Sequence, residues 1–308
     1  MSPTVSILIV TYNSCAVLSE CLDSIAAETR LPYEIIIVDN NSQDDTVALV
    51  RTYYPQVVLI ENKQNVGFAT AVNQVSRASV GTYLLLLNPD TRVQMNAIDR
   101  LVAFMEQHTK VGIVAPYTVD EQGKPAPNSQ AYHTVGSLFW RTQLGGPLKP
   151  LAQRILAGKK AEEKSVEAVY GCALLIRSEL YHALGGLDER FFLYEEDIDL
   201  CHRVLACDLA VVRVANVTIV HYGGQGSTLP DSTPEQKAIA DITHRLRSRS
   251  LYARKHFSPW EALMLHLGYT FTGVGLLLYS LFASSHPLRN RRRTIGRRYF
   301  QTGLGGMR

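Results

Sequence analysis

Three groups of side chains in this sequence have the types and positions needed to do chemistry. Asn88-Pro89-Asp90-Thr91 follows an apolar run, Glu195-Glu196-Asp197-Ile198-Asp199 opens a helical pattern, and His221 ends another apolar run. A carboxylate at a strand end can hold a divalent cation on a diphosphate, because Mg²⁺ takes one or two protein carboxylates plus phosphate oxygens and water. Crowded carboxylates raise one another's pKa, which helps to make a general base. Each group also has a structural interpretation: a turn, helix N-terminal acids and a strand-end histidine.

Short apolar runs alternate with helical patterns over the first third of the chain, and these elements must position the reactive groups. Ser14 and Ser42 are expected to cap two of the helices. Strands that alternate with helices predict βαβ units, and hence an α/β fold with a mostly parallel sheet flanked by helices. The expected strands cover residues 5–10, 35–38, 57–60, 83–87 and 112–115.

Polar, turn-forming residues follow four of these strands. In such sheets the ligand lies off the carboxyl ends of the strands, so we expect one polar rim there. The phosphate-binding P-loop, the dinucleotide fingerprint G-x-G-x-x-G and the G-x-S-x-G elbow are absent from the sequence, so none of those sites is predicted. The rim consists of Thr11-Tyr12-Asn13, Asp39-Asn40-Asn41, Asn65-Val66-Gly67 and Asn88-Pro89-Asp90.

The patterned body is expected to end near Gly226. Residues 118–165 lose periodicity and predict a long connection, a feature that is often functional. Order returns at 169–177, a helix is expected through about Cys207, and two strands are expected at 209–214 and 217–222. The sequence therefore predicts one domain over 1–226 and a helical extension over 227–308.

The extension combines an uncharged segment with basic flanks. Residues 262–283 carry no charge, and this segment is long enough for a membrane span. The 23 residues from His286 to Arg308 contain seven Arg and no acidic residue. A single span would translocate one basic flank, against the positive-inside tendency. We therefore expect an in-plane or re-entrant segment on an anionic membrane surface, with a spanning helix, a buried helix or a homo-oligomer interface as alternatives. The tail lacks the interleaved aromatics and motifs of nucleic-acid binding, so no nucleic-acid partner is expected.

Cysteine usage and the start of the chain bear on location. The five Cys form no C-x-x-C pair, which favours inert thiols in a reducing compartment. Met1-Ser2-Pro3-Thr4 is not a basic region followed by an apolar stretch, so no signal peptide is predicted. The expected location is the cytoplasm, at the inner face of the cell membrane.

Seven segments, in this order and spacing, give the sequence a family resemblance. It resembles inverting family 2 glycosyltransferases with the A-type glycosyltransferase fold, and rhamnosyltransferase-like members that build cell-surface polysaccharide in particular. The segments are VSILIVTYN from Val5, VDNNS from Val38, NVGFA from Asn65, LLLLNPDT from Leu84, GGLDERFF from Gly185, EDIDL from Glu196 and VHYGG from Val220.

The resemblance implies site roles position by position. Asp197 corresponds to the catalytic base, with Glu196 beside it. Asp90 would hold Mg²⁺ or Mn²⁺ together with His221, although Asn88 replaces the first carboxylate of the usual D-x-D motif. The residues implied to bind the nucleotide sugar are Thr11, Asn13 and Asp39 at the nucleoside, Asn65 and Asn73 near the ribose and diphosphate, and Asn88 and Asp90 at the diphosphate.

The resemblance also implies the reaction. A sugar, with L-rhamnose from dTDP-L-rhamnose favoured and UDP- and GDP-sugars left open, would pass with inversion to a hydroxyl of a lipid-linked or polysaccharide acceptor. Residues 1–117 would hold the nucleotide sugar and 118–226 the acceptor. A different class, a non-catalytic nucleotide-sugar- or polysaccharide-binding module tethered to the membrane, is the alternative. The presence of Asp90, Asp197 and His221 together favours the enzyme.

Overall fold

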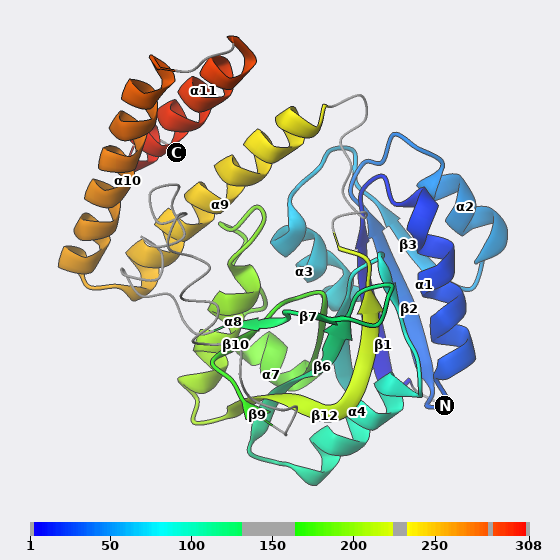
Figure 1. Cartoon of the computed structure of the whole chain (residues 1–308). Coiled ribbons are helices and arrows are strands. Elements are labelled where there is room, and N and C mark those ends of the chain that lie inside the picture. Colours follow the sequence, from blue (N-terminus) through cyan, green and yellow to red (C-terminus); the bar gives the residue numbers. More distant parts are fainter. Residues whose placement is uncertain (1–2, 131–163, 224–232, 283–285, 306–308) are drawn as a thin grey trace. The chain divides into compact units, whose positions relative to one another are not determined.

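The chain divides into two compact units in a computed structural model that describes residues 3–130, 164–223, 233–282 and 286–305 (Figure 1). The larger unit has the described residues 3–130, 164–192 and 196–223. The smaller unit contains the described residues 193–195, 233–282 and 286–305. The three residues 193–195 therefore belong with the C-terminal helices, although the sequence around them continues in the larger unit.

A mixed sheet forms the centre of the larger unit. Its first four strands are parallel, in the order β3-β2-β1-β4, and fall where the apolar runs predict them. They are β1 (Val5–Thr11), β2 (Tyr33–Asp39), β3 (Val58–Glu61) and β4 (Tyr83–Leu87). The sheet continues through β11 (Ala173–Arg177), β6 (Val111–Val119), β12 (Ala210–His221) and β5 (Thr91–Arg92). Because β11 runs antiparallel to both β4 and β6, the sheet is mixed at this point.

Helices cover both faces of this sheet, as the alternating pattern predicts (Figure 1). One face packs against α1 (Cys15–Glu28), α2 (Thr46–Tyr53) and α4 (Ala97–Gln107), whose apolar stripes enter the main core. The other elements that contact the sheet are α3 (Phe68–Ala78), α7 (Ser178–Ala183) and α8 (Glu196–Leu205). Gly112 of β6 leaves room for Val204 of α8, because a Cβ there would lie 2.5 Å from its Cγ1. Short strands β7 (Pro125–Ala126), β8 (Ser129–Gln130), β9 (Lys164–Ser165) and β10 (Ala168–Val169) complete the unit.

Three local expectations are wrong. Ser14 precedes α1 but its hydroxyl makes no cap hydrogen bond, and it accepts from Tyr12 N instead. Ser42 does not cap α2, because the structure uses its hydroxyl at the end of β2. The two strands expected at 209–214 and 217–222 are one strand, β12, whose register against β6 shifts between Arg213 and Thr218; Asn216 has φ = 60° in that interval. Most of the long connection at 118–165 lies outside the described residues.

The smaller unit consists of α9 (Pro234–His256), α10 (Pro259–Ser280) and α11 (His286–Gly303). Capping boxes start α9 at Thr233 and α10 at Ser258, each with proline at the first helical position. Figure 1 shows α10 and α11 side by side. The core of this unit consists of Leu246 and Ala253 of α9, Leu265 and Tyr269 of α10, and Ile295 and Tyr299 of α11.

Candidate active site

The first part of the rim is a hydrogen-bonded corner at the ends of β1 and β2. The parallel register places Thr11 opposite Asp39, and Thr11 Oγ1 donates to Asp39 Oδ1 at 2.9 Å. Ser42 closes the corner: its backbone N donates to Asp39 Oδ2 at 2.8 Å, and its hydroxyl accepts from Asn13 N at 2.8 Å. Asn13, with φ = 53°, accepts from Gln43 N through its side chain. The structure therefore brings Thr11, Asn13 and Asp39 together, and it adds Ser42, which sequence reasoning assigned to a helix cap.

Asn40 organises the next part of the rim. Its Nδ2 donates to Asn65 Oδ1 at 3.0 Å and to the carbonyl of Gly67 at 3.2 Å, while its Oδ1 accepts from Val66 N at 3.0 Å. Gly67 has φ = 88°, and a Cβ there would lie 2.7 Å from the carbonyl oxygen of Phe192. The loop can take this path only with glycine at that position. Asn65 therefore lies on the rim, anchored to the residue that follows Asp39.

Asn73 has a structural role in this geometry. Its Nδ2 donates to the carbonyl of Leu187 at 2.8 Å and to Glu189 at 3.0 Å. Its Oδ1 accepts from Tyr181 OH at 2.6 Å and from Leu187 N at 3.0 Å. An amide offers two donors and about two acceptor positions, so these contacts use all of them. The geometry therefore does not support the sequence-based expectation that Asn73 contacts the sugar donor.

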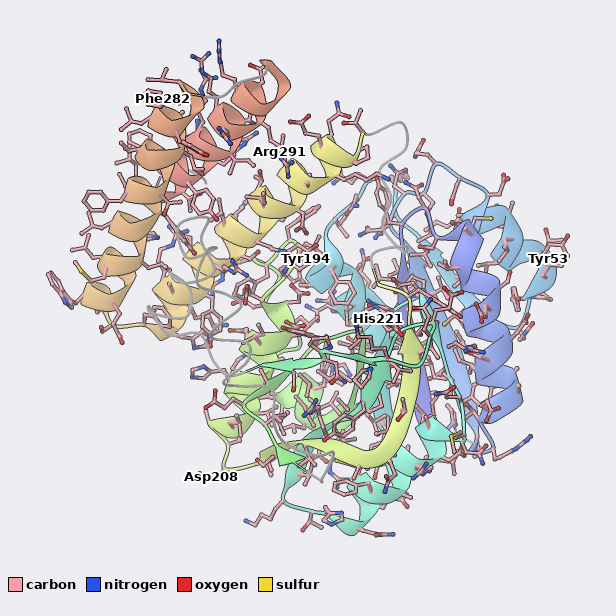
Figure 2. The ribbon with its side chains drawn as sticks, viewed as in Figure 1. Tyr53, Tyr194, Asp208, His221, Phe282 and Arg291 are labelled. Atoms are coloured by element: carbon pink, nitrogen blue, oxygen red, sulfur yellow. The ribbon has the colours of Figure 1, made fainter. Side chains whose placement is uncertain are left out.

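Asp90 and His221 meet across the pairing of β5 with β12. His221 lies opposite Thr91 in that pairing, and its Nε2 lies 3.3 Å from Asp90 Oδ1 (Figure 2). Asn88 Nδ2 is 3.5 Å from the same ring nitrogen. The Asp90 side chain is 3% exposed and that of His221 is 22% exposed. The sequence-predicted pair is thus brought together, with Asn88 beside it.

The electrostatics of this pair favour positive charge at the site. Burial by itself lowers the pKa of His221, but hydrogen bonds with Asp90 and Cys172 and the negative charge beside the ring outweigh it and raise the pKa from 6.5 to about 10. Since the folded-state pKa is raised, the ion pair stabilises the fold fully below pH 6.5, and this contribution is lost as the pH rises through about 10.

The same pair fits a hard divalent cation. Adjacent ligands of an octahedral ion with bonds of 2.0–2.1 Å lie roughly 3 Å apart, close to the separation of Oδ1 and Nε2. Among the described residues, no group of three or more His, Cys, Asp or Glu side chains is placed to hold a metal. Asp90 and His221, the latter after loss of its Nε2 proton, would therefore supply two ligands, and the others would come from the diphosphate and water, as is usual for Mg²⁺.

The acidic residues at the start of α8 have different surroundings in the structure. Asp199 is fully buried and forms an ion pair with Arg203, with 2.9 Å between Oδ2 and Nε. Glu195 is 4% exposed and pairs with Arg249 at 3.1 Å. Asp197 is only partly buried, and Gly171 N donates to its Oδ2 at 2.8 Å. A hydrogen-bond donor that orients a carboxylate without neutralising it suits a general base. Glu196, beside it, is 5% exposed.

Two consecutive residues link Asp197 to the Asp90–His221 pair. Gly171 N holds Asp197, as described above. The next residue, Cys172, accepts Asn88 N through its carbonyl at 3.0 Å, and its thiol interacts with the ring of His221. The turn between β10 and β11 therefore contacts both the acidic residue of α8 and the pair at the end of β4.

The segment just before α8 is held by α9 in an unusual backbone conformation. Tyr194 and Glu195 have φ = 70° and 71°, in the left-handed region that costs about 1–3 kcal/mol for such residues unless the surroundings enforce it. Arg249 pairs with Glu195, and Arg245 lies over the Tyr194 ring, with its guanidinium carbon 3.8 Å from the ring centroid. Ser248 Oγ donates to the carbonyl of Leu193 at 2.7 Å.

We call the α9 side chains that grip residues 193–195 the α9 clamp. It consists of Arg245, Ser248 and Arg249, together with Asp241, which accepts from Tyr194 OH. Arg249 is the most buried charge among them that faces a carboxylate, with 12% of its side chain exposed. Sequence analysis did not predict the α9 clamp, because nothing local in the sequence identifies the partner of Glu195.

Comparisons with known proteins agree with this fold. Residues 6–182 match Glycosyl transferase family 2, so the chain belongs to that family and is a glycosyltransferase. It is similar to the N-acetylglucosaminyl-diphospho-decaprenol L-rhamnosyltransferase of Mycobacterium tuberculosis, with 26% identity covering 96% of this chain and 98% of that protein. The low-salt glycan biosynthesis hexosyltransferase Agl10 of Haloferax volcanii is 24% identical, covering 82% of this chain and 78% of that protein.

A solved structure supports the fold assignment. The mannosyltransferase PcManGT from Pyrobaculum calidifontis, in complex with GDP-Man and Mn²⁺, superposes with a TM-score of 0.57 at 17% identity, covering 99% of this chain and 87% of that one. The expected A-type glycosyltransferase fold and the rhamnosyltransferase-like resemblance are therefore confirmed. At this identity the likeness is one of fold.

Proposed function

We propose that the protein is an inverting rhamnosyltransferase that transfers L-rhamnose from dTDP-L-rhamnose to a hydroxyl group of a lipid-linked glycan acceptor. The observation that carries the proposal is the Gly171–Cys172 turn, which contacts both Asp197 and the Asp90–His221 region. Inversion by one displacement needs one general base and one place for the leaving diphosphate, and no covalent intermediate. The rhamnosyl donor follows from the relative in Mycobacterium tuberculosis, whose name states that activity.

In the proposed reaction Asp197 removes the proton of the acceptor hydroxyl as its oxygen attacks the anomeric carbon. Backbone N–H groups orient both carboxylate oxygens, because Gly171 N donates to Oδ2 and Ile198 N donates to Oδ1, each at 2.8 Å; a carboxylate oxygen has a second lone pair with which to accept the proton. In the transition state the sugar then resembles an oxocarbenium ion, as in glycoside hydrolysis. A divalent cation, Mg²⁺ or Mn²⁺, held by Asp90 and His221 would neutralise the departing diphosphate. Asn88, next to that pair, is placed to contact the same phosphate oxygens.

The nucleoside of the donor is proposed to bind at the Thr11–Asp39 corner. Asp39 receives hydrogen bonds from Thr11, from Ser42 N and from the Ser42 hydroxyl, which fix its carboxylate at the end of β2. A carboxylate fixed in this way can accept an N–H of a pyrimidine base. Asn65, on the adjoining loop, is proposed to lie toward the ribose.

The acceptor is proposed to be lipid-linked, which would place the enzyme at the inner face of a membrane. The named substrate of the mycobacterial relative contains a decaprenol diphosphate. Among the described residues, α10 is the one helix that is long and apolar enough to cross a membrane by length and composition. An anionic membrane surface is therefore the proposed partner of the C-terminal helices.

A thermal-shift panel tests donor and metal together. Because a ligand at 100 times its Kd stabilises by about 2.7 kcal/mol, dTDP-L-rhamnose with Mn²⁺ should raise Tm by roughly 5–10 °C. UDP-glucose and GDP-mannose serve as matched donors, and each is measured with Mg²⁺, with Mn²⁺ and with EDTA. A larger shift with one of these two donors would replace dTDP-L-rhamnose in the proposal. No shift with any nucleotide sugar would contradict the assigned donor site.

A second prediction concerns the effect of the α9 clamp on turnover. Glu195 is joined to Glu196 by one peptide bond, so loss of the Arg249–Glu195 pair releases the strained residues that lead into α8. Arg249→Ala should lower kcat by up to about 10²-fold, the usual effect of a misplacement near 1 Å, while KM for the donor stays near its wild-type value. The measurement is steady-state dTDP release with varied donor.

Controls separate positioning from loss of folding. Arg247→Ala removes the same charge from an exposed position of α9 and should leave kcat unchanged. The double variant Glu195→Gln/Arg249→Met removes both buried charges, which is less destabilising than leaving one unpaired, and should recover part of the lost melting temperature. A rise in donor KM with unchanged kcat in Arg249→Ala would contradict a role through α8.

A further inference from the structure

The C-terminal helices carry an apolar surface that no described part of the protein covers. Nine of the fourteen large apolar side chains exposed in the described residues lie between 260 and 282. Six of them are spaced by three or four residues, which puts them on one side of α10. We call this row the α10 stripe; it consists of Trp260, Leu263, Leu267, Phe271, Val274 and Leu278.

Scattered exposed apolar residues are ordinary, but a continuous row of them marks an interaction surface. The exposed fractions reach 66% at Trp260 and 67% at Phe271, and Phe282, just beyond the end of α10, is 82% exposed (Figure 2). At 1.5 Å per residue, the stripe extends over roughly 30 Å. The opposite side of α10 is already covered by protein, since Leu265 and Tyr269 are buried in the core of this unit.

The packing of α11 against α10 brings arginines alongside the same helix. A Cβ at Gly273 would lie 2.5 Å from Phe300 N, and one at Gly303 would lie 2.6 Å from Thr270 N, so the two backbones approach each other closely. Nearer the end of α10, the Arg292 guanidinium carbon lies 3.9 Å from the centroid of the Tyr279 ring. Helix α11 therefore runs antiparallel beside α10 from about residue 279 back to about residue 270.

This arrangement argues against a membrane-spanning α10. A span would centre the bilayer near residue 270, and α11 would then carry Arg297 and Arg298, which lie between the Gly296 and Phe300 contacts, into the hydrocarbon. Arginine is costly at that depth, and most of all where no acidic partner exists. The segment His286–Gly303 contains no acidic residue. An in-plane orientation avoids this cost, because arginine side chains can then reach the lipid head groups.

We propose that α10 lies in the plane of a membrane that contains anionic lipids, with the α10 stripe inserted below the head groups and the arginines of α11 against them. The inference specifies the membrane partner of the proposed function and rests on it only for its catalytic consequence. The charges complement an anionic surface, because five arginines beyond Arg289 lie along α11, a helix that carries no acidic residue. They are Arg291, Arg292, Arg293, Arg297 and Arg298.

Vesicle sedimentation tests the surface without any requirement for turnover. The full chain should sediment with vesicles of equal parts phosphatidylcholine and phosphatidylglycerol, and much less with phosphatidylcholine alone. Leu267→Glu/Phe271→Glu should lower the partition coefficient by roughly 10²-fold, because two inserted side chains are lost. Tyr53→Glu, at an equally exposed apolar position on α2, should leave it unchanged.

Tryptophan depth decides between in-plane and spanning orientations. The chain has two tryptophans, so Trp140→Phe leaves Trp260 as the sole reporter, and adding Trp260→Phe with Leu267→Trp or Leu278→Trp moves the reporter along α10. Brominated lipids should quench all three positions at the same shallow depth. Deepest quenching at 267 with shallower quenching at both ends would overturn the in-plane proposal in favour of a span.

Two further outcomes complete the test. A full chain that ignores anionic vesicles and forms a dimer in sedimentation velocity, a dimer dissolved by Leu267→Glu/Phe271→Glu, would mean that a second copy covers the stripe. Failure of the proposed function has a different signature, namely vesicle binding as expected but no release of dTDP with any acceptor. Activity of the double variant on a short soluble acceptor should equal that of the wild type, since the stripe lies outside the proposed catalytic residues.

Discussion

Asp197→Asn should reduce turnover by about 10²–10⁴-fold, the usual contribution of general base catalysis, while nucleotide-sugar binding and the melting temperature stay near wild type. The amide keeps the shape of the side chain, and its oxygen can still accept from Gly171 N, so the turn between β10 and β11 is preserved. What is lost is the capacity to take the acceptor proton. The measurement is single-turnover sugar transfer, which separates chemistry from product release.

Two neighbouring carboxylates provide matched controls for this prediction. Glu196→Gln should have a much smaller effect on turnover. Asp199→Asn removes a fully buried charge that pairs with partly exposed Arg203, so it should lower the melting temperature markedly and affect turnover only through folding. If Glu196→Gln loses activity while Asp197→Asn keeps it, the base is Glu196, and the interpretation of the Gly171 contact is wrong.

Asp90→Ala and His221→Ala should each abolish most of the metal-dependent binding of the nucleotide diphosphate. Outer hydrogen-bond partners of a metal ligand typically contribute 10- to 100-fold in affinity, so loss of a direct ligand should exceed about 10²-fold. Binding of the nucleotide measured in EDTA should change little, because the nucleoside is proposed to rest on Thr11 and Asp39. Isothermal titration with dTDP, with and without Mn²⁺, measures both quantities.

Asn88→Ala offers a graded comparison for the metal site. Its amide lies 3.5 Å from His221 Nε2 but carries no charge, so its loss should weaken metal-dependent binding less than loss of Asp90. Full turnover of the wild type in EDTA would remove the cation from the mechanism. Equal losses with and without metal in Asp90→Ala would instead indicate that Asp90 acts by shaping the end of β4.

Local sequence patterns determined the secondary structure and the position of the rim. The strands β1 to β4 and the apolar stripes of α1, α3 and α4 occur where their periodicity predicts them, because burial on one face of a helix or on both faces of a strand is written in adjacent residues. Thr11 and Asp39 end β1 and β2, and Asp90 follows β4, so the local pattern also located these polar residues. The uncharged length of α10 was also visible as a local property.

Tertiary structure decided which of these carboxylates pair with an arginine. Glu195, Asp197 and Asp199 look equivalent in the sequence, but Arg249 and Arg203 neutralise two of them, and those arginines come from α9 and from one turn further along α8. Asn73, which the resemblance placed near the ribose and diphosphate, has its amide occupied by four contacts from residues 181–189. The contacts of Asn73 and Glu195 join distant parts of the chain, which local periodicity cannot encode, whereas Asp199 and Arg203 form an i,i+4 pair within one helix.

The environment of α10 likewise depended partly on the sequence and partly on tertiary structure. The basic flanks favoured an in-plane helix, but the sequence left a span, a buried helix and an oligomer interface open, because hydropathy reports how apolar a segment is and not what surrounds it. The close approach of Gly273 to α11 places arginines along the helix, and the stripe lies on a side of α10 that α11 does not cover. The sequence by itself determined that this helix is stable only in contact with an apolar environment. The packing of α11 decided which side of α10 can contact lipid, because a charge fixed beside a helix limits how deeply that helix can enter lipid.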